Sequence, residues 1–132
     1  MTTAAATAED PYFEVQLLAS SLGAAIALWY DLCLADVLGD DTLSTATWTR
    51  RDTTQCTIVT SEINQNQLTV TFQDGSTRTF AVGEVARVKV SFEDDAVLKL
   101  GDELYLDCVY TTSGGETDVR TLKFLVVENY SR

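Results

Sequence analysis

From residue 45 to the C-terminus, short segments of alternating apolar and polar residues are separated by turn residues, and this pattern constrains the fold most. A period of two places every second side chain on one face, which is typical of half-buried β-strands. Residues 45–51 and 53–60 are rich in threonine and β-branched residues, which favour strands. Turn signals recur about every eight to twelve residues, a spacing that indicates an antiparallel β-sandwich or small barrel.

Three later segments alternate most clearly. The apolar residues that we expect to face the core are Val88, Val90 and Phe92, then Leu104, Leu106, Cys108 and Tyr110, and finally Leu122, Phe124 and Val126. The last segment also carries Leu125 and Val127 on its opposite face, so both of its faces are apolar. Either a central position in a sheet or an edge covered by a neighbouring molecule explains such a strand.

Asp74-Gly75 predicts a tight hairpin between residues 68–72 and 76–82. A two-residue turn sets Phe72 opposite Thr77. A bulge at Gly75 shifts the register by one and brings Phe80 and Val82 to the face of Phe72. We favour the bulged form.

Residues 12–39 are predicted to be a helical segment, with the helix itself over 17–38. Asp10 before Pro11 is a suitable helix start, and Gly39 is a suitable end. Apolar residues at spacings of three and four form a stripe that includes Leu18, Leu22, Ile26 and Trp29. A strand over 12–18 stays open as an alternative, because apolar and polar residues also alternate there.

The predicted helix is apolar on more than one side, so it needs cover on more than one side. A small β-domain covers one side only, which favours self-association or docking onto a larger body. Residues 1–11, whose side chains are mostly small, are expected to form an N-terminal arm. The expected organisation is therefore an arm (1–11), a helical segment (12–39) and an antiparallel β-domain (45–132).

Composition excludes several classes of function. The chain has no histidine, so imidazole cannot serve as a base or a metal ligand. Its net charge of −11 repels phosphate backbones, so we expect no direct binding to nucleic acid. We found no catalytic arrangement, no phosphate-binding glycine loop and no calcium-loop spacing, and expect no enzyme activity, cofactor or metal site.

Three cysteines, Cys33, Cys56 and Cys108, cannot all pair within one chain, and their spacing matches no zinc or redox motif. We expect buried free thiols and a reducing compartment, with a Cys56–Cys108 bridge left open. The longest uncharged stretch, residues 15–30, is shorter than the ~20 residues that span a bilayer. We therefore expect no membrane-spanning segment and no membrane partner. The N-terminus is also a poor export signal, because no positively charged region precedes this stretch.

Arg50-Arg51 is the only adjacent pair of basic residues and could meet an acidic patch on another copy. The residues that we expect at an interface are Leu18, Leu22, Ile26, Trp29, Arg50, Arg51, Leu125 and Val127.

An arm followed by one helix and a threonine-rich β-domain resembles the small structural virion proteins of tailed bacteriophages. The residues that carry this resemblance are MTTAAATAED and LKLGDELYLDCVYTTSGGETDVRTLKFLVVE, the latter looking like the closing strands of an immunoglobulin-like sandwich. Capsid decoration (cement) proteins typically trimerise and clamp neighbouring capsomers. The resemblance therefore implies a homo-oligomer, such as a trimer, that is assembled in the host cytoplasm and bound to the capsid in the virion. A neck, tail or fibre role fits almost as well.

Two other classes stay open. An acidic protein that mimics DNA can block the basic cleft of a nucleic-acid enzyme, but the acids here are scattered along the sequence rather than spaced as a double row. A bacterial immunoglobulin-like adhesion or scaffold domain is disfavoured, because the N-terminus lacks the features of an export signal.

Overall fold

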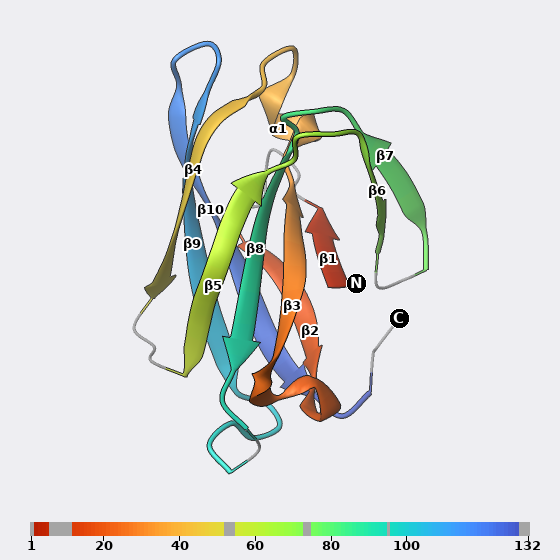
Figure 1. Ribbon diagram of the computed structural model, residues 1–132, viewed down its shortest axis with the longest axis vertical. Helices are drawn as coiled ribbons and strands as arrows, with labels where there is room; N and C mark the ends of the chain where they lie inside the picture. The colour runs from red at the N-terminus through yellow and green to blue at the C-terminus, as the bar shows by residue number, and fades with distance from the viewer. Residues whose placement is uncertain (1, 6–11, 52–54, 73–74, 95, 130–132) are drawn as a thin grey trace.

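The computed structural model describes residues 2–5, 12–51, 55–72, 75–94 and 96–129, which are mainly β (Figure 1). Sheet A contains, in spatial order, β1 (Thr2–Ala5), β3 (Gly23–Cys33), β8 (Val85–Phe92) and β5 (Cys56–Ile63). Sheet B contains β2 (Tyr12–Leu18), β10 (Thr117–Val127), β9 (Glu103–Thr112) and β4 (Leu43–Arg51). A two-stranded sheet pairs β6 (Leu68–Thr71) with β7 (Thr77–Phe80), and the short helices are η1 (Ala19–Ser21) and α1 (Ala35–Leu38).

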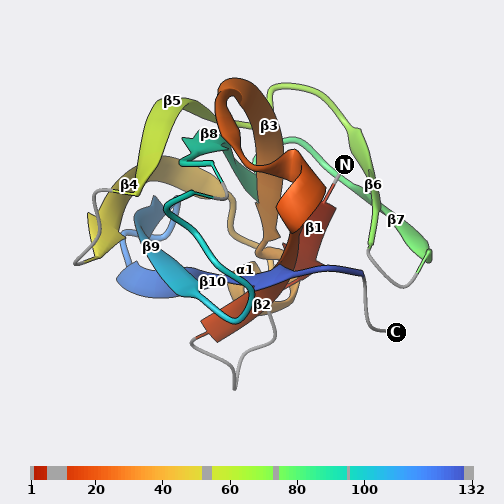
Figure 2. The same ribbon diagram turned by 90° about the horizontal axis from the view of Figure 1, so that it is seen from below.

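Sheets A and B form two layers that face each other, as the view along the strands shows (Figure 2). The pairings β3–β8, β8–β5, β10–β9, β9–β4 and β6–β7 are antiparallel, which confirms the prediction of a mainly β fold with antiparallel sheets. The two parallel pairings, β1 with β3 and β2 with β10, both involve the N-terminal strands. The N-terminal part of the chain thus adds one edge strand to each sheet.

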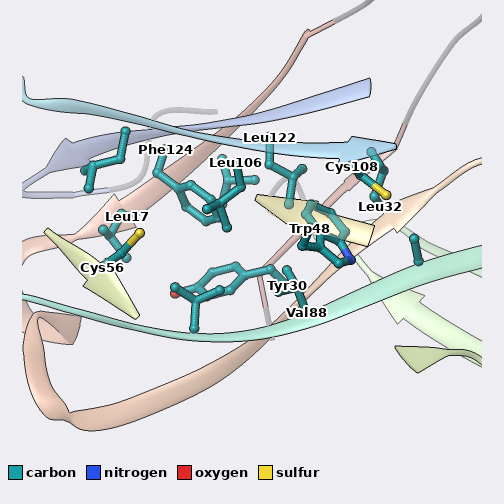
Figure 3. Close-up of a cluster of buried hydrophobic side chains, with 14 of the residues drawn as sticks. Leu17, Tyr30, Leu32, Trp48, Cys56, Val88, Leu106, Cys108, Leu122 and Phe124 are labelled. Atoms are coloured by element: carbon teal, nitrogen blue, oxygen red, sulfur yellow. The ribbon is translucent and has the colours of Figure 1, made fainter. Parts of the chain in front are cut away.

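The core lies between the two layers (Figure 3). The inward-facing residues predicted for 88–92, 104–110 and 122–126 are all buried, which confirms that alternation. Tyr30 of sheet A meets Phe124 of sheet B edge to face, with ring centroids 4.9 Å apart. The apolar outer residues of β10 fit the central-strand explanation, because β10 lies between β2 and β9.

The helix predicted over 17–38 is wrong. These residues form the end of β2, η1, β3 and the four-residue helix α1, and the alternative strand over 12–18 is confirmed as β2. The reason is that the C-terminal end of β3 is buried on both faces: Tyr30 and Leu32 enter the main core, whereas Asp31 and Cys33 are covered on the opposite face. A strand buried on both faces loses the period of two and reads as continuously apolar.

This correction removes the over-apolar helix from which self-association was argued, because these residues form strands and the C-terminal end of β3 is buried in its own fold, while Ile26 and Leu28 stay exposed. It also changes the expected N-terminal arm. Thr2–Ala5 form strand β1 within sheet A, and residues 1 and 6–11 of the expected arm lie outside the described residues.

The β6–β7 hairpin adopts the bulged register. Thr71 pairs with Thr77, and the backbone N–H of Phe72 donates to the carbonyl of Ser76 at 2.8 Å. Phe80 joins the face of Phe72 as predicted, whereas Val82 lies beyond β7 and is exposed. This face packs against sheet A in a satellite cluster, whose buried members are Cys33, Val70, Phe80 and Val85.

Asn64 fixes the base of this hairpin. Its side-chain oxygen accepts hydrogen bonds from the backbone N–H groups of Gly83, Glu84 and Val85 at 3.0–3.1 Å. Its amide nitrogen donates to the carbonyls of Asn66 and Ala81. The side chain is 3% exposed, so it replaces a strand ladder where the chain leaves β5 and re-enters sheet A.

Candidate interaction face

The outer face of sheet B, opposite the core, lies away from the β6–β7 hairpin (Figure 2). Outward residues follow from the register, because they alternate with the buried ones along each strand. One row crosses all four strands, in the order Arg51 (β4), Tyr105 (β9), Lys123 (β10) and Glu14 (β2). We call these four residues the central row.

Arg51 is held by a bidentate pair with Asp107, which follows Tyr105 by two positions on β9. Its Nε lies 3.0 Å from Oδ2 and its Nη2 lies 2.5 Å from Oδ1. Thr121 of β10 donates to the same carboxylate at 2.6 Å, and the guanidinium carbon lies 5.4 Å from the centre of the Tyr105 ring. Burial acts to raise the pKa of Asp107, but the hydrogen bonds from Arg51 and Thr121 and the nearby positive charge hold it below its usual value.

Lys123 occupies the other half of the central row. Its Nζ contacts the carboxylate of Glu103 and lies 3.6 Å from that of Glu14. The hydrogen bond to Glu103, together with the two negative charges, raises the pKa of Lys123. Both cations of the row are therefore oriented by carboxylates on neighbouring strands.

The central row lines an open hollow of about 450 Å³. Its walls combine two cations, one carboxylate and one phenol ring, so it can accept a protruding side chain of either polarity. An exposed pair, Val109 and Val119, lies further along β9 and β10 at 42% and 44% exposure. Half-buried Leu18, Leu125 and Val127 lie toward the opposite end of the face.

Charge distinguishes this face from the rest of the chain. It holds the cations Arg51 and Lys123 and the carboxylates Glu14, Glu103 and Asp107, so its net charge is −1 against −11 for the chain. Many of the remaining exposed acids lie in loops at the two ends of the layers. Asp40 and Glu116 lie at the end near α1, and Glu93 and Asp94 lie at the other (Figure 1).

The residues predicted at an interface divide between surfaces. Four of them, Leu18, Arg51, Leu125 and Val127, lie on this face. Arg50 lies on the opposite side of β4, where its guanidinium donates to the carbonyl of Cys56 at 2.8 Å. The helical stripe itself is wrong, because Leu22 is buried in the core while Ile26 is 38% exposed on β3.

Trp29, the last member of that stripe, lies on the outer face of sheet A, where the Arg87 guanidinium stacks on its ring at 5.0 Å. A common interface for all eight predicted residues is therefore not possible on one face. Which of them contact a partner stays a prediction.

Sequence reasoning did not select Asp107, Tyr105, Lys123 or Glu14. The sequence did contain a signal for these residues, because each alternates with apolar residues of its own segment. The missing information was the register that brings β4, β9, β10 and β2 side by side.

The three cysteines are buried free thiols, as expected. Cys56 and Cys108 lie apart in the core, so the bridge left open is absent (Figure 3). Burial raises the pKa of Cys108 to about 12 and also raises that of Cys56 and Cys33, which disfavours the nucleophilic thiolate.

Within the described ranges, no group of three or more cysteine, aspartate and glutamate side chains is arranged to hold a metal ion. None of the described helices is long and apolar enough to cross a membrane. Comparisons with known protein families, with curated proteins and with solved structures found nothing that matches this chain.

Proposed function

We propose that this chain is a non-enzymatic structural protein that forms assemblies, as a virion component of a tailed bacteriophage that decorates or cements the capsid. The observation that carries the proposal is the outer face of sheet B, which is open and nearly neutral on a chain of net charge −11. Contacts between copies would use this face. The two four-stranded layers around an apolar core support an immunoglobulin-like sandwich as its scaffold.

The physical argument is electrostatic. Copies of a strongly acidic protein repel one another, so they associate best through surfaces on which the charge is low and internally paired. The face of sheet B meets this condition and adds exposed apolar contact at Val109 and Val119. The acidic loops at the two ends disfavour end-to-end contacts and so favour side-by-side packing.

A DNA-mimic inhibitor is less well supported, because many of the exposed acids are divided between the two ends instead of forming a double row on one face. A neck, tail or fibre position would use the same kind of face. It belongs to the same class of structural function.

The proposal is tested by sedimentation velocity on the full chain from micromolar to millimolar concentration, at low and high salt. We expect an oligomer of the wild type that Val109→Asp weakens and that Val82→Asp leaves intact. Val82 is a matched control, since it is exposed to a similar degree but lies outside sheet B. A wild type that stays monomeric throughout, or that inhibits deoxyribonuclease I at low salt only, would overturn the proposal.

A further inference from the structure

The order of charges in the central row specifies how two copies can meet. Resting on the proposed function, we propose that two copies pack the outer faces of their sheets B together around a two-fold axis that runs parallel to the strands, between β9 and β10. The occupant of this face is thus a second copy of the same chain.

The row is self-complementary under only one in-plane two-fold operation. Copies packed face to face are related by an axis lying in the plane between them. An axis parallel to the strands reverses the strand order, so that β4 faces β2 of the second copy and β9 faces β10. An axis across the strands instead places each strand on its own copy.

The two orientations have opposite electrostatic consequences. With the axis parallel to the strands, Arg51 faces Glu14 of the second copy, and Tyr105 faces Lys123 of the second copy. Each contact forms twice in the dimer: two pairs of opposite charges, and two pairs of a cation with an aromatic ring. With the axis across the strands, Arg51 would face Arg51 and Lys123 would face Lys123.

Two of the rows beyond the centre agree with the same axis. Val109 faces Val119 of the second copy, which covers two side chains that are each more than 40% exposed in the single chain. Asp107 faces Thr121 of the second copy, so no carboxylate meets another carboxylate in that row.

The hollow lies on the proposed axis, because it is lined by the central row itself. The hollows of the two copies would therefore face each other. The cations would enter the contact already paired with Asp107 and Glu103 of their own chain. Such pairing lowers the cost of removing them from water, since a buried charge without a partner is strongly unfavourable.

Two charge reversals test the axis. In Glu14→Lys (E14K) the introduced lysine faces Arg51 of the second copy, and in Arg51→Glu (R51E) the introduced glutamate faces Glu14. Each variant alone should dimerise roughly tenfold or more weakly than the wild type, measured as Kd by sedimentation equilibrium. An equimolar mixture should recover, because both cross-contacts are then between opposite charges.

General charge effects predict the reverse for E14K. This variant makes the chain less negative by two charges, which alone would strengthen association. Glu116→Lys makes the same change in the β9–β10 turn and should not weaken the dimer. Thermal unfolding checks each fold, and Arg51→Gln replaces R51E if the latter unfolds: its mixture with E14K should still be tighter than E14K alone.

The outcomes separate the two proposals. If the wild type forms an oligomer that E14K does not weaken, or if the mixture associates no better than E14K alone, the two-fold axis is wrong and the structural function stands. A trimer sensitive to Val109→Asp but not to E14K would likewise exclude the axis and leave the structural function in place. A wild type that stays monomeric overturns both.

Discussion

The outer faces of the two sheets each carry an aspartate–arginine pair, but the two pairs are buried to different degrees. Each carries an aspartate and an arginine on neighbouring strands: Asp31 and Arg87 in sheet A, Asp107 and Arg51 in sheet B. The β6–β7 hairpin packs over one end of sheet A, next to the first pair, whereas the second pair lies on the open face. The side chain of Asp31 is 0% exposed and that of Asp107 is 20% exposed.

This difference in burial separates a charged pair that stabilises the fold from one that can contact another molecule. A buried carboxylate depends on its partner, because water cannot replace it. The half-buried pair in sheet B keeps contact with solvent and contributes less to folding, so its arginine remains able to meet a second molecule. Covered charge in sheet A therefore stabilises this fold, and open charge in sheet B is suited to recognition.

The largest expected effect comes from removing Asp31, the buried carboxylate of sheet A. Asp31→Ala leaves the Arg87 guanidinium, whose side chain is 16% exposed, without its 2.7 Å partner. We expect the free energy of unfolding to fall by about 3–5 kcal/mol, measured by urea denaturation. Asp107→Ala is the matched control and should lower it by about 1 kcal/mol or less. Equal losses in the two variants would show that the difference in burial has no energetic meaning.

The covering hairpin is the next target. Asn64→Ala removes the side-chain acceptor of the Glu84 and Val85 N–H groups, while the Gly83 N–H keeps the backbone carbonyl of residue 64, and we expect local destabilisation of about 1–3 kcal/mol. Because the hairpin buries Cys33, its opening should speed the reaction of this thiol with an aromatic disulfide reagent. Cys56 and Cys108, which lie in the main core, should stay protected, as peptide mapping would show.

Asn66→Ala is the control for that variant, because Asn66 is exposed and accepts the Asn64 hydrogen bond through its backbone carbonyl, which the substitution keeps. Unchanged labelling of Cys33 in Asn64→Ala would mean that the side-chain hydrogen bonds do not hold the hairpin in place.

The sequence predicted strands β4, β9 and β10 of sheet B well because their outer residues are largely polar, whereas β2 had been placed in the helical segment. Leu104, Leu106 and Cys108 alternate with outward polar residues, and that alternation survives only where solvent covers the second face. The bulged hairpin was predictable for a local reason, since Gly75 tolerates the φ of 90° that the turn requires.

Strand β3 was mispredicted because its surroundings come from distant parts of the chain. Its second face is covered near Cys33 by Val70 and Phe80, which follow it by several strands. The sequence of residues 17–38 does not show that other parts of the chain cover this strand. An apolar stretch without a period of two was therefore assigned to a helix.

The candidate face was only partly predictable for a related reason. Arg51 stood out as part of a basic pair, but its partner Asp107 lies 56 residues later and reads as an ordinary outward position. Cross-strand rows exist only once the register is fixed.

The smallest expected effect is the pH dependence of the stability that the Asp107 carboxylate contributes. The folded-state pKa of Asp107 lies below its ordinary value of 3.8, so the ionised carboxylate stabilises the fold fully above that value. This contribution should disappear as the pH falls through the folded-state pKa, because both states are then protonated. Asp107→Asn should therefore lower the free energy of unfolding by roughly 0.5–1 kcal/mol at neutral pH, with the difference from wild type vanishing in strong acid. Urea titrations of the two proteins at several pH values measure this difference. A difference that is independent of pH would mean that the Arg51–Asp107 pair stabilises the fold through its shape and not through its charge.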